Sequence, residues 1–394
     1  MKGFRFVVIA LLTALLTAQA SAMVQTRPAG MDDGRKGKKA LTEEEWDQRM
    51  SVDGPYIIYG DDGSARVITV NGKGKVKDKV YAKGLPADYS FKVTDHEGNY
   101  PFEVRLHAVE RPAWKFERPD SVFVMSDPHG RLDCVVSLLQ GNGIIDGKLH
   151  WNFGTNHLVI IGDIFDRGYD ATQIFWLVYQ LEQEATDAGG QLTFLLGNHE
   201  PFILDNDLRY TKRKYHMLAD TLGVEYARLW AADTELGRWL GTRGTMQVIG
   251  RDLYVHAGLG REFYEWNLTI PQVNEEMSRA LFLKKPDRRA LSPLTKFLYG
   301  NSGPIWYRGL VRQDAKYHPM PADSLQMVLD RYETDRLFVG HTIFDDISSF
   351  YNGRVIDVNV DNKINREARR GRAVLLVGDK TYVVGDEGVM RELE

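Results

Sequence analysis

Apolar residues recur along this chain as short uninterrupted runs, each followed closely by glycine or by polar and charged residues. Such a run without alternation is typical of a strand that is buried on both faces. Between several runs the apolar spacing changes to the helical period, over Leu132 to Leu139 and Thr172 to Ala185. Strands that alternate with helices predict an α/β fold. The buried strands expected on this basis cover residues 122–125, 157–161, 192–196, 253–255 and 337–339.

The pattern differs on both sides of these runs. Over residues 55–118 short β-prone pieces alternate with turn residues, including the hairpin signal Asn71-Gly72, and we expect a small N-terminal β-rich domain there. Residues 119–394 then form a catalytic domain with a mainly helical insert at about 205–240 and hairpins near the end. Its second half is more β-rich and is expected to be antiparallel. We predict an αββα sandwich, in which mixed sheets are flanked by helices.

The first 22 residues are typical of a secretory signal peptide. Lys2 and Arg5 precede an apolar run from Phe6 to Leu16, and small residues at a cleavage position follow, as in Ala18-Gln19-Ala20. A membrane span needs roughly 18 or more apolar residues, and this run is shorter. We therefore expect an exported protein, periplasmic or secreted, with no stable membrane anchor and with a polar linker over residues 23–54.

Charge and cysteine content narrow the possible partners and structural crosslinks. The formal net charge is −4 and the pI about 6.2, so no basic field attracts nucleic acid. The single cysteine, Cys134, lies in an apolar helical pattern and is expected in the core, without an intramolecular disulfide.

Residues of the metal-ligand type follow five of the predicted strands. They are Asp127 with His129, Asp163, Asn198 with His199, His256, and His341. The donors are oxygens and imidazoles with no thiolate, which favours a catalytic divalent or trivalent metal over a structural zinc. We call each of these points, where a strand ends and a loop begins, a corner. A histidine at one corner alone more often has its hydrogen bonds satisfied within the core. Five corners in order, each with such residues, indicate a single site.

Three longer stretches carry a resemblance to a known family. They are Gly162-Asp163-Ile164-Phe165-Asp166-Arg167-Gly168, Asn198-His199-Glu200 and Gly303-Pro304-Ile305-Trp306-Tyr307-Arg308-Gly309. With them, the chain from about Asp120 to Asp361 resembles the phosphoprotein phosphatase superfamily of metallophosphoesterases, and especially its Shewanella-like bacterial branch. The resemblance implies a protein phosphatase of the Ser/Thr or Tyr type with two metal ions, either Mn, Fe or Zn.

The resemblance also implies a role for each matching residue. Asp127 and His129 hold the first metal, Asp163 bridges both, and Asn198, His256 and His341 complete the second site. Arg167 and Arg308 bind the phosphoryl oxygens together with Asn198, and His199, oriented by Asp166, is the general acid. Ser126 and Ala257 stand where the family commonly has glycine, which affects loop geometry rather than the ligand set.

This set of residues suits phosphate monoester hydrolysis. Two metals about 3.5–4 Å apart lower the pKa of a bridging water, which attacks in line, and arginine forks bind the charge on the equatorial oxygens. The expected substrate is a phosphorylated protein or a small phosphoester. Two alternatives stay open: a diester or dinucleoside polyphosphate hydrolase on the same scaffold, and a non-catalytic module that binds phosphorylated ligands.

Four aromatic residues in or near the motif loops bear on the substrate. Tyr210, Trp306, Tyr307 and Tyr299 could form a wall for a phosphotyrosine ring, but packing in the core or the insert is the favoured interpretation, because aromatic side chains bury well.

Overall fold

The computed structural model describes residues 41–361, 364–365, 368 and 371–393. The predicted signal peptide and residues 23–40 of the predicted linker lie outside them. Glu43–Glu394 form one compact unit, and the N-terminal β-rich segment belongs to it; the predicted domain boundaries stay a prediction. No helix within the described residues combines the length and the apolar character that crossing a membrane requires.

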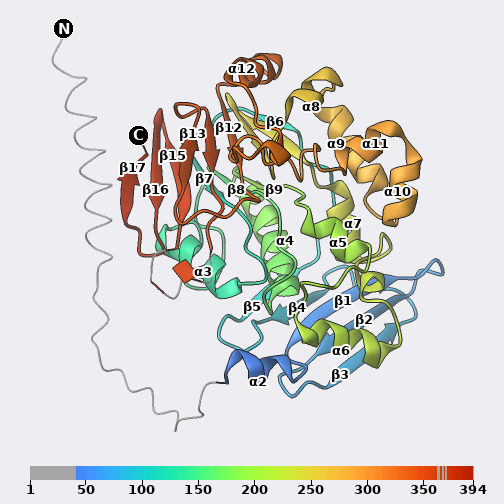
Figure 1. The fold of residues 1–394 in the computed structure, drawn as a ribbon. Helices are drawn as coiled ribbons and strands as arrows, with labels where there is room; N and C mark the ends of the chain where they lie inside the picture. The colour runs from blue at the N-terminus through green and yellow to red at the C-terminus, as the bar shows by residue number, and fades with distance from the viewer. Residues whose placement is uncertain (1–40, 362–363, 366–367, 369–370, 394) are drawn as a thin grey trace, which may run out of the picture. The chain divides into compact units, whose positions relative to one another are not determined.

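The first of two six-stranded sheets is mixed (Figure 1). Its three neighbouring parallel strands are β7 (Ser121–Met125), β8 (His157–Ile160) and β9 (Gln191–Phe194). Antiparallel strands extend it beyond β7: β15 (Ala373–Val377), β16 (Lys380–Val384) and β17 (Met390–Glu392). The buried runs that the sequence predicted at residues 122–125, 157–161 and 192–196 are the three parallel strands.

The second sheet is mixed as well, with the order β13-β14-β12-β11-β10-β6. Its strands are β6 (Lys115–Phe116), β10 (Met246–Ile249), β11 (Asp252–Val255), β12 (Arg336–Val339), β13 (Ser348–Phe350) and β14 (Val355–Asp357). The expectation of an antiparallel second half is wrong for its centre, since β11, β12 and β14 run parallel. A helical crossover lies between β11 and β12, and such a connection returns the chain in the same direction.

The two sheets pack face to face, as the period-two alternation along each strand shows. On β7, Val122 and Val124 join a buried cluster that includes Tyr254 and Phe338 of the second sheet. The rings of Tyr254 and Phe338 stack with their centroids 5.0 Å apart. The intervening Phe123 points to the opposite face, into a cluster with the helices. Each sheet is therefore buried on both faces, and the predicted αββα sandwich is confirmed.

Helices cover the outer face of each sheet (Figure 1). On the first sheet these are α3 (Leu132–Gly141) and α4 (Ala171–Asp187). On the second they are α8 (Arg261–Glu265), α9 (Ile270–Ala280), α11 (Pro293–Leu298) and α12 (Ala322–Arg331), with the short η2 (Ala315–Tyr317) before α12. Helix α10 (Lys285–Leu291) packs against α11. The region of the predicted insert contains α6 (Arg213–Leu222), η1 (Tyr226–Trp230) and α7 (Glu235–Thr242), after α5 (His199–Leu204).

The β-rich N-terminal segment packs on α4. It contains α2 (Glu43–Asp47), a sheet of β1 (Asp53–Tyr59), β2 (Ala65–Val70) and β3 (Val76–Tyr81), and a pair of β4 (Ser90–Val93) and β5 (Phe102–Arg105). The indole of Trp176 on α4 donates a hydrogen bond to the carbonyl of Pro55, at 3.0 Å. Tyr56 lies in the same buried cluster as Trp176. This segment thus supports α4 from the side opposite the first sheet.

Candidate active site

The loops that follow β7, β8, β9, β11 and β12 carry every predicted metal ligand. Parallel strands end at the same edge of a sheet, so their loops meet there. Several ligands have a left-handed backbone, with φ of 49° at Asp127, 42° at His129, 57° at Asp163 and 64° at His341. Such a conformation is costly for residues other than glycine and is concentrated at functional sites.

Hydrogen bonds between neighbouring corners hold these conformations in place. The backbone N–H of His129 donates to the carbonyl of Asp163 at 3.0 Å, and that of His341 donates to Asp127 Oδ2 at 3.1 Å. Glycine lets the corners approach: a Cβ on Gly197 would lie 2.1 Å from Asp163 Oδ1, and one on Gly340 only 1.9 Å from Ser126 Oγ. Larger residues at these two positions would separate the loops.

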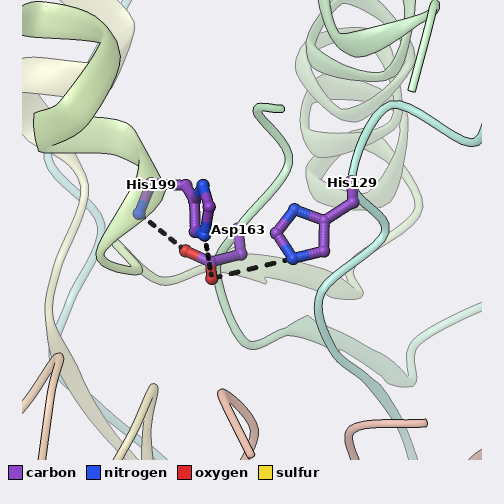
Figure 2. A group of neighbouring side chains, drawn as sticks. All are labelled: His129, Asp163 and His199. Carbon is purple, nitrogen blue, oxygen red and sulfur yellow. Dashed lines mark hydrogen bonds and ion pairs between the residues drawn. The ribbon is translucent and has the colours of Figure 1, made fainter. Parts of the chain in front are cut away.

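The carboxylate of Asp163 is the centre of the site. Its Oδ2 lies 4.0 Å from His129 Nε2, 3.9 Å from His199 Nε2 and 3.2 Å from His256 Nε2. Figure 2 shows the imidazoles of His129 and His199 next to each other at this carboxylate, and their ring centroids lie 4.8 Å apart, edge to face. The backbone N–H of His199 also donates to Asp163 Oδ1, at 2.9 Å.

Two groups of potential ligand atoms share Asp163. One group combines it with His129 and His199, the other with His256 and His341, and the ligand atoms within each group lie within 4.8 Å of one another. The remaining predicted ligands lie beside them. Asp127 Oδ1 is 3.9 Å from His129 Nε2, and Asn198 Oδ1 is 3.1 Å from His256 Nε2. The structure therefore brings all six predicted ligands together and also places His199, the predicted acid, at ligand distance.

The histidines are oriented for a cation. His129 Nδ1 is 2.8 Å from the carbonyl of Phe165, and His256 Nδ1 is 2.8 Å from that of Ile161. A carbonyl only accepts, so each Nδ1 donates, and Nε2 faces the carboxylates. Among the atoms of the described residues, the buried Nε2 of His341 finds no hydrogen-bond partner. An unsatisfied imidazole nitrogen beside carboxylates fits a bound metal ion.

The electrostatics of the cluster also favour a cation. Although burial opposes it, Asp163 and Asp127 raise the pKa of His256 to about 10. Burial and the neighbouring His199 lower the pKa of His129 to about 3, and burial together with His256 holds that of His341 well below its usual range. The imidazoles of His129 and His341 are therefore neutral, and they lie beside carboxylates that attract positive charge. Metal binding needs ligands in this protonation state, because a neutral imidazole can donate a lone pair.

The predicted acid and the predicted phosphate-binding arginines lie around this cluster. His199 Nδ1 forms a short hydrogen bond with Asp166. Although burial opposes its charged form, Asp163 and then Asp166 raise the pKa of His199. The guanidinium of Arg308 is held by the carbonyl of His341 at 3.2 Å and by Thr342 Oγ1 at 2.8 Å. Arg167 is exposed, and its backbone N–H donates to the carbonyl of Tyr210, at 2.9 Å.

Sequence reasoning assigned no role to Glu200, although it lies beside two predicted site residues. This carboxylate is fully buried and accepts backbone N–H groups from Gly197 at 2.7 Å, Ile164 at 3.0 Å and Asp163 at 3.2 Å. It thereby joins the loop after β8 to the loop after β9. Burial and the negative charge of Asp163 raise the pKa of Glu200 to about 7. The sequence signal that could have indicated a role for Glu200 is its position directly after His199 in the stretch Asn198-His199-Glu200.

Two further residues near Asp127 were not singled out as functional. Ser126, noted only as a departure from glycine, donates its hydroxyl to the carbonyl of Ile161 at 2.9 Å and makes a short contact with Asp127. Asp357, at the end of β14, is 1% exposed, and burial raises its pKa well above the usual range. No pattern distinguishes Asp357 in the sequence.

The four aromatic residues considered for the substrate divide into two pairs. Tyr307 and Tyr299 pack: their hydroxyls donate to the carbonyls of His318 and Met277. Tyr210 and Trp306 lie at the site, with ring centroids 5.5 Å from the imidazoles of His199 and His341 respectively. The packing interpretation fits the first pair, and the proposed wall fits the second.

An αββα sandwich with oxygen and imidazole donors converging at one sheet edge is the architecture of a metal-dependent phosphoesterase. The family model for the calcineurin-like phosphoesterase domain matches residues 121–344. The chain belongs to this family. The predicted enzyme class, a metal-dependent phosphatase, is confirmed, and the structure provides clusters suited to its metals.

Relatives support the Shewanella-like branch. The chain is 25% identical over 298 residues to Shewanella-like protein phosphatase 2 of Arabidopsis thaliana, covering 62% of this chain and 72% of that protein. It is 22% identical over 235 residues to Shewanella-like protein phosphatase 1 of Plasmodium berghei, covering 56% of this chain and 60% of that one. The crystal structure of the cold-active protein-tyrosine phosphatase of a psychrophile Shewanella species superposes with a TM-score of 0.78 at 29% identity, over 88% of this chain and all of the other.

Proposed function

We propose that this protein is a dinuclear protein phosphatase that acts on phosphotyrosine. The observation that carries the proposal is the single carboxylate of Asp163, shared by two groups of ligand atoms. The aryl preference is supported by Tyr210 and Trp306 at the site and by the similar structure that is titled a protein-tyrosine phosphatase. We propose Mn, Fe or Zn as the metals, because the donors are oxygen and imidazole nitrogen.

In this proposal the metal ligands are those predicted from the sequence. Asp127 and His129 would hold one ion, Asn198, His256 and His341 would hold the other, and Asp163 would be a ligand common to both. Bound ions of this kind supply a water of lowered pKa and polarise the phosphoryl group.

The remaining residues bind the substrate and move the proton. Arg167 and Arg308 bind the phosphoryl oxygens through their guanidinium forks, together with the amide of Asn198. His199 carries a proton on Nε2 and delivers it to the leaving phenolic oxygen. Asp166 accepts the other ring N–H and so fixes both the tautomer and the direction of that proton.

A turnover assay tests the proposal. With Mn²⁺ or Zn²⁺ present, the full chain should hydrolyse an aryl phosphate and a phosphotyrosine peptide, and a chelator should abolish both reactions. Bis-nucleoside polyphosphates and a phosphodiester serve as the contrast. Faster turnover of these substrates would favour the diester or dinucleoside polyphosphate alternative, for which we see no supporting observation. Absence of turnover with every phosphate ester would contradict an enzymatic function.

We also propose export, on the basis of the N-terminal pattern of residues 1–22. Mass spectrometry of the mature chain should find an N-terminus close to Ala22 in the exported fraction. An intact Met1 on the mature protein would contradict this proposal.

A further inference from the structure

Two hollows in the surface share Arg209 and Tyr210 as parts of their walls. The first has a volume of about 800 Å³, begins at Asn198 in the metal site and ends among α10 and α11. The second has a volume of about 640 Å³, contains Arg167 and lies against the start of α6. We call them the α10–α11 hollow and the α6 hollow. Each therefore leads away from a residue that is proposed to contact the phosphoryl group.

The walls of both hollows are strongly basic, in contrast to the rest of the chain. Eight arginine and lysine residues line them against three aspartate and glutamate residues, whereas the whole chain has a net charge of −4. Two of the three carboxylates already form ion pairs: Asp205 with Arg288 at 3.2 Å, and Asp47 with Lys212 at 3.7 Å.

Four of the lining cations are available for a ligand. Lys285, Arg289 and Lys296 in the α10–α11 hollow and Arg213 in the α6 hollow are all exposed. Within the described part of the chain, no carboxylate lies at ion-pair distance from any of them. They point to a ligand that carries negative charge beyond the phosphoryl group itself.

A row of aromatic rings borders the metal site next to these hollows. From Tyr210 the row continues to Phe202, with centroids 6.1 Å apart, and to Trp306, a further 5.5 Å away. Its two ends approach His199 and His341, each at 5.5 Å. A phosphorylated side chain that reaches the metals would pack against these rings, and the chain on either side of it would enter the hollows.

We infer that the two hollows bind the residues flanking the phosphorylated residue of a protein substrate, and that these flanking residues are acidic. The inference rests on the proposed phosphatase function and names its substrate class: an extended phosphopeptide segment with Asp or Glu on both sides. Complementary charge of this kind speeds encounter and selects between partners. An exposed ion pair contributes about 0.2–1 kcal/mol, which converts to roughly 1.4- to 5-fold in kcat/KM for each pair.

The test uses peptides with one common phosphotyrosine core and flanks of either Glu or Gln. The enzyme variants are Arg289→Gln with Lys296→Gln for the α10–α11 hollow, and Arg213→Gln for the α6 hollow. The matched control is Lys73→Gln with Lys75→Gln, which removes two exposed charges at the hairpin between β2 and β3, outside both hollows.

The wild-type enzyme should prefer the Glu-flanked peptide in kcat/KM. The hollow variants should lose this preference by about 1.4- to 5-fold per removed charge, while their turnover of p-nitrophenyl phosphate stays unchanged. The control variant should keep the preference, and raising the ionic strength should erase it in the wild type, because exposed charges are screened. The salt series needs no substitution, so it tests the inference even when a variant does not fold.

Equal kcat/KM for the two peptides in the wild type, or a preference that survives in the hollow variants or at high salt, would overturn the inference. In those cases turnover of p-nitrophenyl phosphate by the wild type still supports the proposed function. If the wild type loaded with metal does not turn over p-nitrophenyl phosphate, the proposed function itself fails. The two failures are therefore distinguishable.

Discussion

The two sheets contribute unequally to the metal site. The first sheet supplies Asp127, His129, Asp163 and Asn198 from the loops after β7, β8 and β9, and His199 from the start of α5. Among the described residues, the second supplies His256 and His341, from the loops after β11 and β12. The carboxylate shared by both ligand groups, and the buried Glu200 that ties two of its loops together, belong to the first sheet.

This difference indicates a division of labour. The first sheet forms a nearly complete ligand group with its own hydrogen-bond support. The second completes the other group and anchors the Arg308 guanidinium through the His341 carbonyl. Substitution of the shared ligand on the first sheet should therefore reduce the binding of both ions, and substitution of a ligand on the second sheet should reduce the binding of one. The following experiments probe that asymmetry.

The largest effect is expected from Asp163→Asn. Because Asp163 belongs to both ligand groups, this nearly isosteric change should reduce the bound metal at both positions. Turnover should fall by more than the ~10⁴-fold ceiling expected for loss of a proton donor. Elemental analysis with kcat for an aryl phosphate measures both quantities. Near-normal metal content with near-normal turnover would remove Asp163 from the centre of the site.

Replacing His341 by Ala should break the second group alone. The buried Nε2 is lost while the backbone carbonyl that holds Arg308 remains. We expect the metal content to fall from about two ions to about one, with a loss of turnover smaller than in the Asp163 variant. Loss of both ions would show that the first sheet cannot hold its metal alone, which contradicts the asymmetry.

His199→Ala distinguishes an acid from a ligand. As the proton donor, His199 should contribute about 10²- to 10⁴-fold to kcat while both ions stay bound. The loss should shrink for substrates with a more acidic leaving phenol, which need less protonation. The alternative is that His199 is a metal ligand, because its Nε2 lies 3.9 Å from Asp163 Oδ2. A fall in metal content in this variant would assign it that role.

Glu200→Gln is expected to have a smaller effect. The residue accepts three backbone N–H groups around Asp163 but is in neither ligand group, so it acts through the position of that carboxylate. Removing comparable support around a metal ligand costs about 10- to 100-fold in metal affinity or activity. Metal titration should show weakened affinity, and kcat at saturating metal should recover. An unchanged affinity would leave Glu200 without a positioning role.

The smallest effect on turnover is expected at the opposite end of β8, where His157 is buried and hydrogen-bonds Thr193 Oγ1 at 2.8 Å. Burial lowers the pKa of His157 to about 3. Between about pH 6.5 and 3 the unfolded chain therefore binds a proton that the folded chain does not, and this costs about 1.4 kcal/mol of stability per pH unit.

The free energy of unfolding therefore decreases as the pH falls. A His157→Gln variant should show a shallower decline of unfolding free energy between pH 6 and pH 4 than the wild type, measured by urea titration. Parallel declines would show that His157 does not set the acid sensitivity.

Much of this site could be predicted because its residues follow apolar runs that only a buried strand explains. Asp163 follows such a run after one glycine, and His256 follows one directly. Within each sheet the parallel strands end at the same edge, so their loops meet there. Side-chain partners could not be predicted. Nothing in the sequence shows that Tyr307 donates to His318, or that Glu200 spans two loops.

The fold was predictable to a similar degree. The alternation of buried runs and helices indicated the sandwich, but not that the two-residue strand Lys115–Phe116 pairs in parallel with β10. A strand of that length has no periodicity to detect. The parallel centre of the second sheet was also missed, because the hairpins near the end of the chain suggested antiparallel neighbours.

The aromatic layer between the sheets has a consequence for metal binding. Since one histidine pair follows strands of one sheet and Asp163 follows a strand of the other, the distance between the two donor sets depends on the buried cluster between the sheets, to which Tyr254 and Phe338 contribute their stacked rings. Smaller side chains in this cluster should change the spacing of the sheets, and with it the size of ion that the site accommodates. Selection for one metal over another can therefore act on core residues that never contact the ion.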